Sequence, residues 1–185
     1  MRIIGGKYKG TPLLSMDGEN TRPTLDRIKE AVFSAIQFEL QGKNVLDLFA
    51  GSGQLALEAL SRGAAYALMC DSNINAYNVI KKNIIKTGAE DCDIVNMDFT
   101  QCIKTSIYKF DIVFLDPPYK SGLIHKTLYL LQESDILSEN AIIIIEKSAE
   151  DTVTDDPGYK IRKVYKYGKI QIVILVCCKQ EEEEF

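Results

Sequence analysis

The chain has 185 residues, of which 46% are hydrophobic, 26% charged and 9% aromatic. This composition argues against collagen-like, disordered and coiled-coil proteins, and the length favours one compact domain with a small extension. There are 22 basic and 26 acidic residues, for a formal charge of −4, and the glutamate run at 181–184 accounts for that difference. The net charge therefore does not exclude a nucleic-acid partner.

Cysteine and histidine usage argues against a metal centre. The five cysteines contain no CxxC pair and His125 is the only histidine, so no ordinary zinc-ligand set is visible. The first residues do not have the pattern of a secretory signal, and the longest apolar stretch, 170–178, is about half a membrane span. We expect a cytoplasmic protein, without metal or membrane association, whose thiols are buried and reduced.

The predicted elements begin with a basic, glycine-containing stretch over residues 2–14, which we interpret as a β-hairpin arm. A helix over 24–40 follows, because apolar residues recur at helical spacing until Gly42 ends the pattern. Apolar strands then alternate with helices, which indicates a parallel sheet covered on both faces. The predicted strands are 45–49, 67–70, 93–97, 110–115 and 141–146, and the helices after the first four are 54–62, 74–87, 100–107 and 123–132.

Two final β-rich runs, 159–167 and 169–178, are separated by Gly168 and predict an antiparallel hairpin at the sheet edge. The predicted fold class is therefore α/β, with a mostly parallel, seven-stranded sheet, helices on both faces, an antiparallel C-terminal hairpin and a small N-terminal β-hairpin arm. We divide the chain into a basic arm over 1–22, a main domain over 23–180, and an acidic tail over 181–185 that we expect to be disordered.

The strongest local signal is the segment Asp47-Leu48-Phe49-Ala50-Gly51-Ser52-Gly53. An apolar strand runs into two glycines and then into a helix, which lets a ligand approach the backbone closely. A tight turn without a ligand is one alternative, and a dinucleotide site is another. Against the dinucleotide, Asp47 would repel a pyrophosphate and would suit an amino group, and Ala56 replaces the third glycine of that fingerprint.

Two further acids stand where strands end. Asp71 follows the second predicted strand and could accept both hydroxyls of a ribose, while Asp98 follows the third and could accept from an exocyclic amine beside the ring of Phe99. Each acid could instead cap the helix that follows it. In open α/β sheets the carboxyl edge of the strands binds ligands, so these two acids together with Asp47 predict a site there.

The fourth predicted strand ends in Asp116-Pro117-Pro118-Tyr119. Two successive prolines give a stiff extended loop, which fixes the directions of the Asp116 carboxylate and the Pro117 carbonyl. These two acceptors could hold both hydrogens of one planar NH₂ group and so help a conjugated amine attack an electrophilic methyl. Tyr119 could stack on the base that carries the amine. The alternative is a helix-breaking turn with a capping aspartate.

These motifs, together with 2–10 (RIIGGKYKG) and 21–33 (TRPTLDRIKEAVF), resemble the RsmD family of bacterial 16S rRNA guanine-N2 methyltransferases. The resemblance extends from residue 2 to about 178 and implies a Rossmann-like class I fold that uses S-adenosylmethionine. It implies that the glycine loop cradles the methionine part, with Asp47 on its amino group, Asp71 on the ribose and Asp98 on the adenine. Many members carry Glu where Asp71 stands, so that contact is expected to be shorter or bridged by water. The implied cofactor-binding residues are Asp47, Phe49, Ala50, Gly51, Ser52, Gly53, Asp71, Ser72, Asp98, Phe99 and Asp116.

The same resemblance implies the residues that handle RNA. Asp116, Pro117, Pro118 and Tyr119 would hold the target guanine as the catalytic set. The implied RNA-binding residues are Arg2, Lys7, Lys9, Arg22, Thr24 and Tyr119. A second basic stretch, 159–169, carries five basic residues and three tyrosines, and it is equally well explained as a solvated edge strand. His125 follows the proline loop, and we interpret it as a surface residue of the helix.

We therefore expect a monomer that methylates 16S rRNA, free or within the small ribosomal subunit. A DNA adenine-N6 or cytosine-N4 methyltransferase would use a similar amine, but the chain shows no added target-recognition domain. A non-catalytic RNA-binding assembly factor would not need intact glycine and proline motifs. A nicotinamide-dependent oxidoreductase is disfavoured by Asp47.

Overall fold

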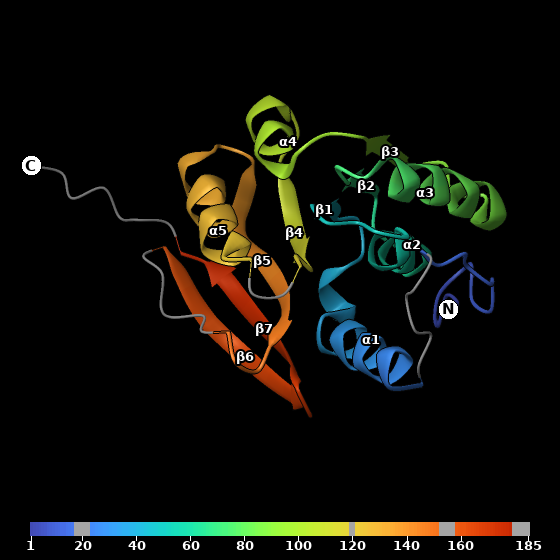
Figure 1. Ribbon diagram of the computed structural model, residues 1–185, viewed down its shortest axis with the longest axis horizontal. Helices are drawn as coiled ribbons and strands as arrows, with labels where there is room; N and C mark the ends of the chain where they lie inside the picture. Colours follow the sequence, from blue (N-terminus) through green and yellow to red (C-terminus); the bar gives the residue numbers. More distant parts are fainter. Residues whose placement is uncertain (17–22, 119–120, 152–157, 179–185) are drawn as a thin grey trace, which may run out of the picture.

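A computed structural model of the protein describes residues 1–16, 23–118, 121–151 and 158–178, and for 23–25 it describes the backbone alone. Seven strands form one sheet in the order β3-β2-β1-β4-β5-β7-β6 (Figure 1). The first five of these strands are parallel to one another, whereas β7 runs antiparallel to both β5 and β6. The strands are β1 Asn44–Asp47, β2 Tyr66–Cys70, β3 Cys92–Val95, β4 Phe110–Leu115, β5 Leu137–Ser148, β6 Tyr159–Tyr167 and β7 Ile170–Cys177. The predicted mixed sheet and C-terminal hairpin are confirmed.

Helices cover both faces of this sheet. One buried cluster joins α1, α2 and α3 to side chains such as Val45 and Ile144, and the other joins α4 and α5 to side chains such as Leu46 and Ile145. Successive strand residues point to opposite faces, so burial on both faces gives the near-continuous apolar runs seen in the sequence. The helices are α1 Pro23–Ala35, α2 Gln54–Ser61, α3 Ile74–Thr87, α4 Phe99–Thr105 and α5 Leu123–Glu133. None of the helices in the described ranges is both long and apolar enough to cross a bilayer.

Several predicted bounds are wrong for identifiable reasons. The helix predicted over 24–40 ends at Ala35, and a 3₁₀ turn, η1 (Gln37–Glu39), follows; Leu40 is nevertheless fully buried, which explains why the apolar spacing extended so far. Strand β1 ends at Asp47 because the chain turns there. Strand β5 begins at Leu137 rather than 141, because Leu137 pairs with Phe110 of β4 before a register shift that precedes Ile142.

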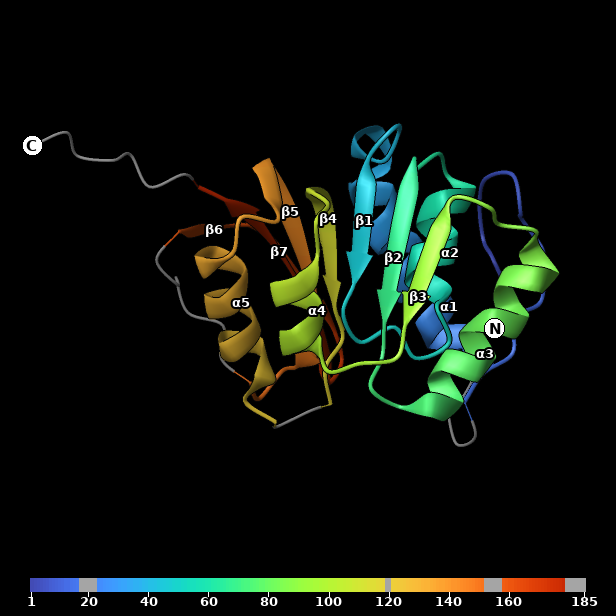
Figure 2. The same ribbon diagram turned by 90° about the horizontal axis from the view of Figure 1, so that it is seen from above.

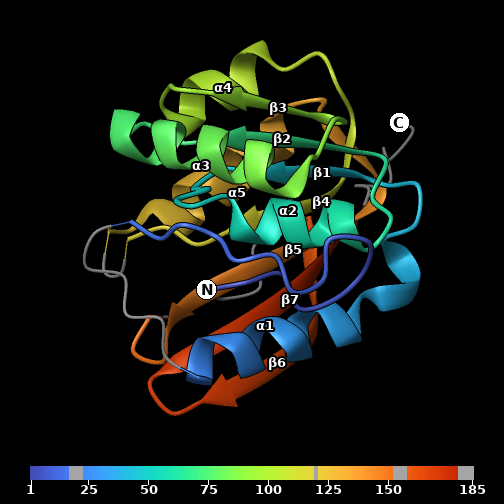
Figure 3. The same ribbon diagram turned by 90° about the vertical axis from the view of Figure 1, so that its right-hand side faces the viewer.

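The N-terminal arm doubles back on itself as a hairpin, with Arg2 and Pro12 forming an isolated antiparallel bridge rather than two full strands. Ile3 and Leu13 are buried in the cluster beneath α1 and α2, so the arm is part of the packed domain. Figure 3 shows the arm lying along α2. The tail at 181–185 lies outside the described residues.

Candidate active site

A cleft of about 650 Å³ opens at the carboxyl end of the parallel strands. Figure 2 shows the arrowheads of β1, β2 and β4 pointing to this common end. The walls of the cleft come from the loops after β1, β2 and β4, from the starts of α2 and α4, and from residues of α5 and β5. The lining residues are Asp47, Leu48, Phe49, Ala50, Gly51, Ser52, Gln54, Leu55, Asp71, Ser72, Asn73, Asp98, Phe99, Asp116, Pro117, Pro118, Leu123, Lys126 and Glu146. The volume lies within the range of about 300–1,000 Å³ typical of small-molecule sites.

The glycine loop takes the backbone shape that the sequence predicts. Gly51 and Gly53 have φ of 53° and 76°, in the left-handed region that favours glycine. A Cβ on Gly53 would lie 3.1 Å from Met69 Sδ, so the turn also requires close packing at this position. Gly53 itself is buried at the start of α2 and does not line the cleft, whereas its neighbours do. Gly53 therefore sets the shape of the glycine loop without contacting the cleft itself.

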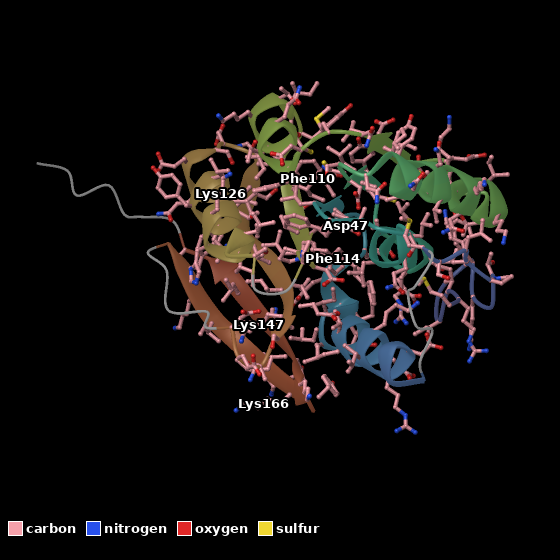
Figure 4. The ribbon with its side chains drawn as sticks, viewed as in Figure 1. Asp47, Phe110, Phe114, Lys126, Lys147 and Lys166 are labelled. Atoms are coloured by element: carbon pink, nitrogen blue, oxygen red, sulfur yellow. The ribbon has the colours of Figure 1, made fainter. Side chains whose placement is uncertain are left out.

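Asp47 lies at the floor of the cleft with a side chain only 1% exposed (Figure 4). Its Oδ1 has no hydrogen-bond partner among the described residues. Burial raises the pKa of this carboxyl to about 7, and the charge of Asp71 acts in the same direction, while the amides of Phe49 and Ala56 oppose the shift. A buried acceptor without a partner is costly, so the position suits a cationic or amino donor.

Asp71 braces the glycine loop. Its Oδ2 accepts the Gly51 N–H at 2.9 Å and its Oδ1 accepts the Asn73 N–H at 2.8 Å. The alternative role as the cap of α3 is wrong, because Asn73 is the cap and its side chain accepts from Asn75 N–H. A carboxylate has about four acceptor sites, so Asp71 retains capacity for ligand hydroxyls.

Asp98 does cap a helix. It accepts from the Thr100 N–H at 2.8 Å and from the Thr100 hydroxyl at 2.5 Å, at the start of α4. The Thr100 hydroxyl bond lowers the pKa of this carboxyl, aided by the amide of Thr100 and the charge of Lys126. Because Asp98 is also exposed and lines the cleft, the cap and a ligand contact are compatible. Phe99 beside it packs on Phe49 with ring centroids 5.2 Å apart.

Asp116, Pro117 and Pro118 line the same cleft directly after β4. Strand pairing aligns Leu115 with Ile145, so Asp116, which directly follows β4, lies level with Glu146 inside β5. Tyr119 lies outside the described residues. The structure thus brings the proline motif and the three strand-end acids to one cavity.

The sequence analysis missed Glu146 and Lys126. Glu146 ends the predicted strand 141–146, so it could have been found in the same way as the other acids at strand ends. Lys126 lies in a helix and not at a strand end, so the sequence pattern did not point to it. Its side chain lines the cleft from α5, with Nζ 5.4 Å from the Phe99 ring centroid. His125 is exposed and does not line the cleft. Across the described ranges, no group of three or more His, Cys, Asp or Glu side chains could hold a metal ion.

The predicted RNA-binding residues of the arm lie outside the cleft. Arg2, Lys7 and Lys9 are exposed. Arg22 and the side chain of Thr24 lie outside the described residues.

A buried carboxylate on α2 holds the arm in place. Glu58 is fully buried and accepts the N–H groups of Ile4 and Gly5 at 2.7 and 2.8 Å. Arg62 Nε donates to it at 2.8 Å, and Lys29 Nζ lies 3.6 Å from its other oxygen. Burial lowers the pKa of Lys29, while the charge of Glu58 opposes that shift. The charges in this network are paired and hydrogen-bonded, as buried charges require.

The arm also reaches the glycine loop. Buried Asn83 on α3 exchanges hydrogen bonds with the backbone of Leu14 and donates to Ser52 O at 2.9 Å. The Ser52 hydroxyl donates to Met1 Sδ at 3.2 Å. The glycine loop and the arm are therefore both held by Asn83 and contact each other through Ser52 and Met1.

Comparison with known proteins identifies the family. The family model described as "Conserved hypothetical protein 95" matches residues 1–176. The chain belongs to this family. It is 34% identical over 158 residues to "Ribosomal RNA small subunit methyltransferase D" of Escherichia coli strain K12, covering 85% of this chain and 80% of that protein.

Solved structures agree with this assignment. The structure of yhhF from Escherichia coli superposes with a TM-score of 0.88 at 29% identity, covering 97% of this chain and 99% of that one. The fold is also shared with SMU.776, whose crystal structure is complexed with SAH, at a TM-score of 0.64 and 18% identity over 78% of this chain and 49% of that one. The Rossmann-like methyltransferase fold expected from the resemblance is confirmed.

Proposed function

We propose that this protein is an S-adenosylmethionine-dependent methyltransferase that acts on the exocyclic N2 amine of a guanine in small-subunit ribosomal RNA. The observation that carries the proposal is one cleft lined both by Asp47, whose buried Oδ1 has no partner among the described residues, and by the Asp116-Pro117-Pro118 loop. The name of the Escherichia coli relative supports the RNA substrate.

The residues present fit the proposed cofactor. Asp47 offers a buried acceptor for an amino group, Asp71 retains acceptor capacity for ribose hydroxyls, and Asp98 beside Phe99 suits an adenine amine and its ring. When bound, the cofactor supplies a methyl group already activated by a sulfonium. The protein then has mainly to position the attacking nitrogen, which makes orientation the main source of rate.

The base side of the cleft accepts the amine. The Asp116 carboxylate and the Pro117 carbonyl each accept one hydrogen of the N2 group, which shifts electron density toward that nitrogen. Tyr119 stacks on the guanine, and the proton lost after transfer passes to Asp116 or to water. A stacked base cannot reach this cleft, so the target nucleotide is splayed out or lies in an unpaired loop.

The exposed cations of the arm, Arg2, Lys7 and Lys9, contact RNA phosphates, and we propose an RNA-binding role for Arg22 and Thr24 as well. The protein acts as a monomer in the cytoplasm on 16S rRNA, free or within an assembling small subunit. Its RNA interface is predominantly electrostatic outside the target pocket.

The test is transfer of labelled methyl from S-adenosylmethionine to unmodified small ribosomal subunits, free 16S rRNA and DNA, followed by nucleoside digestion. We expect N2-methylguanosine in rRNA. Methyladenine or methylcytosine in DNA would replace the proposal with a DNA amino-methyltransferase. Cofactor binding without transfer to any acceptor would favour a non-catalytic assembly factor.

A further inference from the structure

One edge of the sheet carries both cations and aromatic rings near its turn. Strand β6 is the edge strand, and the chain turns through Gly168 and Lys169 into β7. Lys163, Lys166 and Lys169 are exposed, whereas Tyr165 and Tyr167 are half-buried beside the cluster under α1. Single-stranded nucleic acid is held by this combination of cations and stacking rings.

Strand register places this turn at the cleft end of the molecule. Strand β6 runs in the same direction as β5, because each is antiparallel to β7. Glu146, which lines the cleft, pairs with Ile172, and Ile172 pairs with Tyr165. Two strand spacings, about 10 Å, therefore separate the cleft wall from the first tyrosine. Nucleotides that flank a base held in the cleft can span that gap.

Lys147 is not one of the available cations. It is 3% exposed, and its Nζ donates to the carbonyl oxygens of Ser148 and Asp151. Burial lowers the pKa of Lys147; the charge of Asp151 opposes this shift and the charge of Lys166 adds to it. Lys147 of β5 and Lys166 of β6, both labelled in Figure 4, lie level with each other, because each pairs with Gln171 of β7. The buried amine stabilises the turn after β5, and the exposed amines beside it face solvent.

Arg162 is likewise engaged, since its Nη1 lies 2.7 Å from Glu39 Oε1. In contrast, Lys163, Lys166 and Lys169 form no ion pair with the rest of the described chain. Lys163 Nζ lies 5.7 Å from the Tyr165 ring centroid, so a cation already sits over one of the rings. The unpaired positive charge of β6 therefore extends to the cleft end of the strand.

We propose that the tip of this hairpin, residues 163–169, is a second RNA-binding surface that holds the unpaired nucleotides flanking the target base. The inference rests on the proposed function, and it names the contact that keeps the splayed-out strand beside the cleft. Protection of the edge strand against self-association would account for lysines along β6. It would not require Lys169, which lies in the turn, or a tyrosine, Tyr165, level with the cleft wall.

The first experiment compares two triple variants with equal loss of charge. Lys163→Gln, Lys166→Gln and Lys169→Gln remove the cations at the tip. Lys43→Gln, Lys104→Gln and Lys160→Gln remove exposed lysines near the opposite, amino end of the parallel strands. Binding to 16S rRNA is measured over a salt series, with S-adenosylhomocysteine affinity as the check on the cofactor side.

The tip variant should lower the slope of log affinity against log salt by about 2, since a single-stranded contact contributes about 0.7 per charge. At low salt its affinity should fall at least about tenfold. The control should retain the wild-type slope, and both variants should bind S-adenosylhomocysteine as the wild type does. An equal change in the two triples, or none in the tip triple, would overturn the inference.

A second comparison isolates stacking at Tyr167. Tyr167→Leu keeps an apolar side chain but removes the ring, and should weaken rRNA binding about fivefold or more. Tyr167→Phe keeps the ring and should bind as the wild type does. If Leu and Phe bind alike, the ring has no role. If the wild type neither binds nor methylates rRNA, the proposed function is wrong. If the wild type does both and the tip variants behave like it, the proposed function holds and only the RNA-binding role of the hairpin tip is wrong.

Discussion

Asp47 shows how one buried carboxyl sets both the stability and the chemistry of the cleft. Its folded-state pKa is about 7, against an ordinary value of 3.8. Between those two pH values the unfolded chain has lost the proton and the folded protein keeps it. The free energy of unfolding should therefore fall by about 1.4 kcal/mol per pH unit as pH rises through this window.

Asp47→Asn removes this titration. We expect the variant to gain stability relative to wild type as pH rises from 4 to 7, with the difference levelling above 7, measured by urea unfolding at several pH values. Two parallel stability profiles would mean that Asp47 ionises normally. The same substitution should weaken S-adenosylhomocysteine binding and remove its rise with pH, because only the ionised carboxylate pairs with an ammonium group.

Asp116 lines the cleft beside the other implied cofactor-binding residues, but we predict that its main role is to accept from the amine and that cofactor affinity depends little on it. Asp116→Ala should lower methyl transfer by roughly 10²–10⁴-fold, the range of an acid–base contribution, while cofactor binding survives. The control Asp111→Ala removes a carboxylate from the opposite end of β4, where it accepts from Lys43 Nζ, and should keep transfer. Loss of cofactor binding in Asp116→Ala would mean that this residue has been misassigned.

At this scale the sequence located most of the site but not all of it. Asp47, Asp71, Asp98 and Asp116 could be found because each follows an apolar strand, and strand ends share one edge. The brace that Asp71 provides to Gly51 could not be found, since it depends on how two loops twenty residues apart meet. Lys126 could not be found either, because helical spacing alone does not say which side of α5 faces a cleft.

Helix α2 lines the cleft with its first turn and contacts the N-terminal arm with its second half. Its first turn follows the glycine loop, and Glu58 in its second half holds the arm. Glu58→Gln replaces one acceptor oxygen by a donor and leaves Lys29 buried without its counter-charge. The free energy of unfolding should fall by about 3–5 kcal/mol, as it does when one partner of a buried ion pair is removed. The measurement is urea unfolding together with hydrogen exchange at the amides of Ile4 and Gly5.

Ser61→Ala is the matched variant on the same helix. Ser61 accepts the Tyr8 N–H at 2.9 Å and donates to Gly5 O, but carries no charge. Ser61→Ala should lower the free energy of unfolding by about 1 kcal/mol. If Glu58→Gln left arm exchange at the wild-type rate, the arm would be held by its apolar contacts and not by this carboxylate.

Element bounds show where local pattern ends and packing begins. Helix α3 begins and ends where the sequence predicts, because Asn73 caps one end and Gly88, at φ of 67°, ends the other. Helix α1 stops early although Ile36 and Leu40 continue its apolar spacing. Burial of those two side chains is compatible with either an α-helix or a 3₁₀ turn, so spacing alone could not decide between them.

Across the whole molecule, the cleft lies between the arm's side of the sheet and the C-terminal hairpin. Figure 1 shows the arm beyond α2 and the hairpin on the other side of α1. An RNA that contacts the arm and also places a base in the cleft must therefore extend over the surface between them. Replacing Arg2, Lys7 and Lys9 with Ala should weaken rRNA binding and flatten its salt dependence, while S-adenosylhomocysteine affinity stays at the wild-type value. An unchanged salt slope would exclude the arm from the interface.

The overall topology followed from the alternation of strands and helices, which is why the parallel half of the sheet was predictable. The hairpin was predicted from its turn, but its register was not, since nothing local says that β7 pairs with β5 over seven residue pairs. Pairing partners far apart in the chain depend on which edges the remaining elements leave open.

The position of β7 between β5 and β6 has a consequence for the order in which the protein can form during synthesis. Strand β6 pairs with β7 alone, and β7 is made after it. Until β7 leaves the ribosome, β6 has no partner, and the apolar run 141–145 of β5 keeps an open edge. Chain elongation proceeds at about 5–20 residues per second, whereas a hairpin closes in microseconds. The sheet is therefore completed within moments of the arrival of its last strand, and translation of that segment is the step that ends its exposure to aggregation.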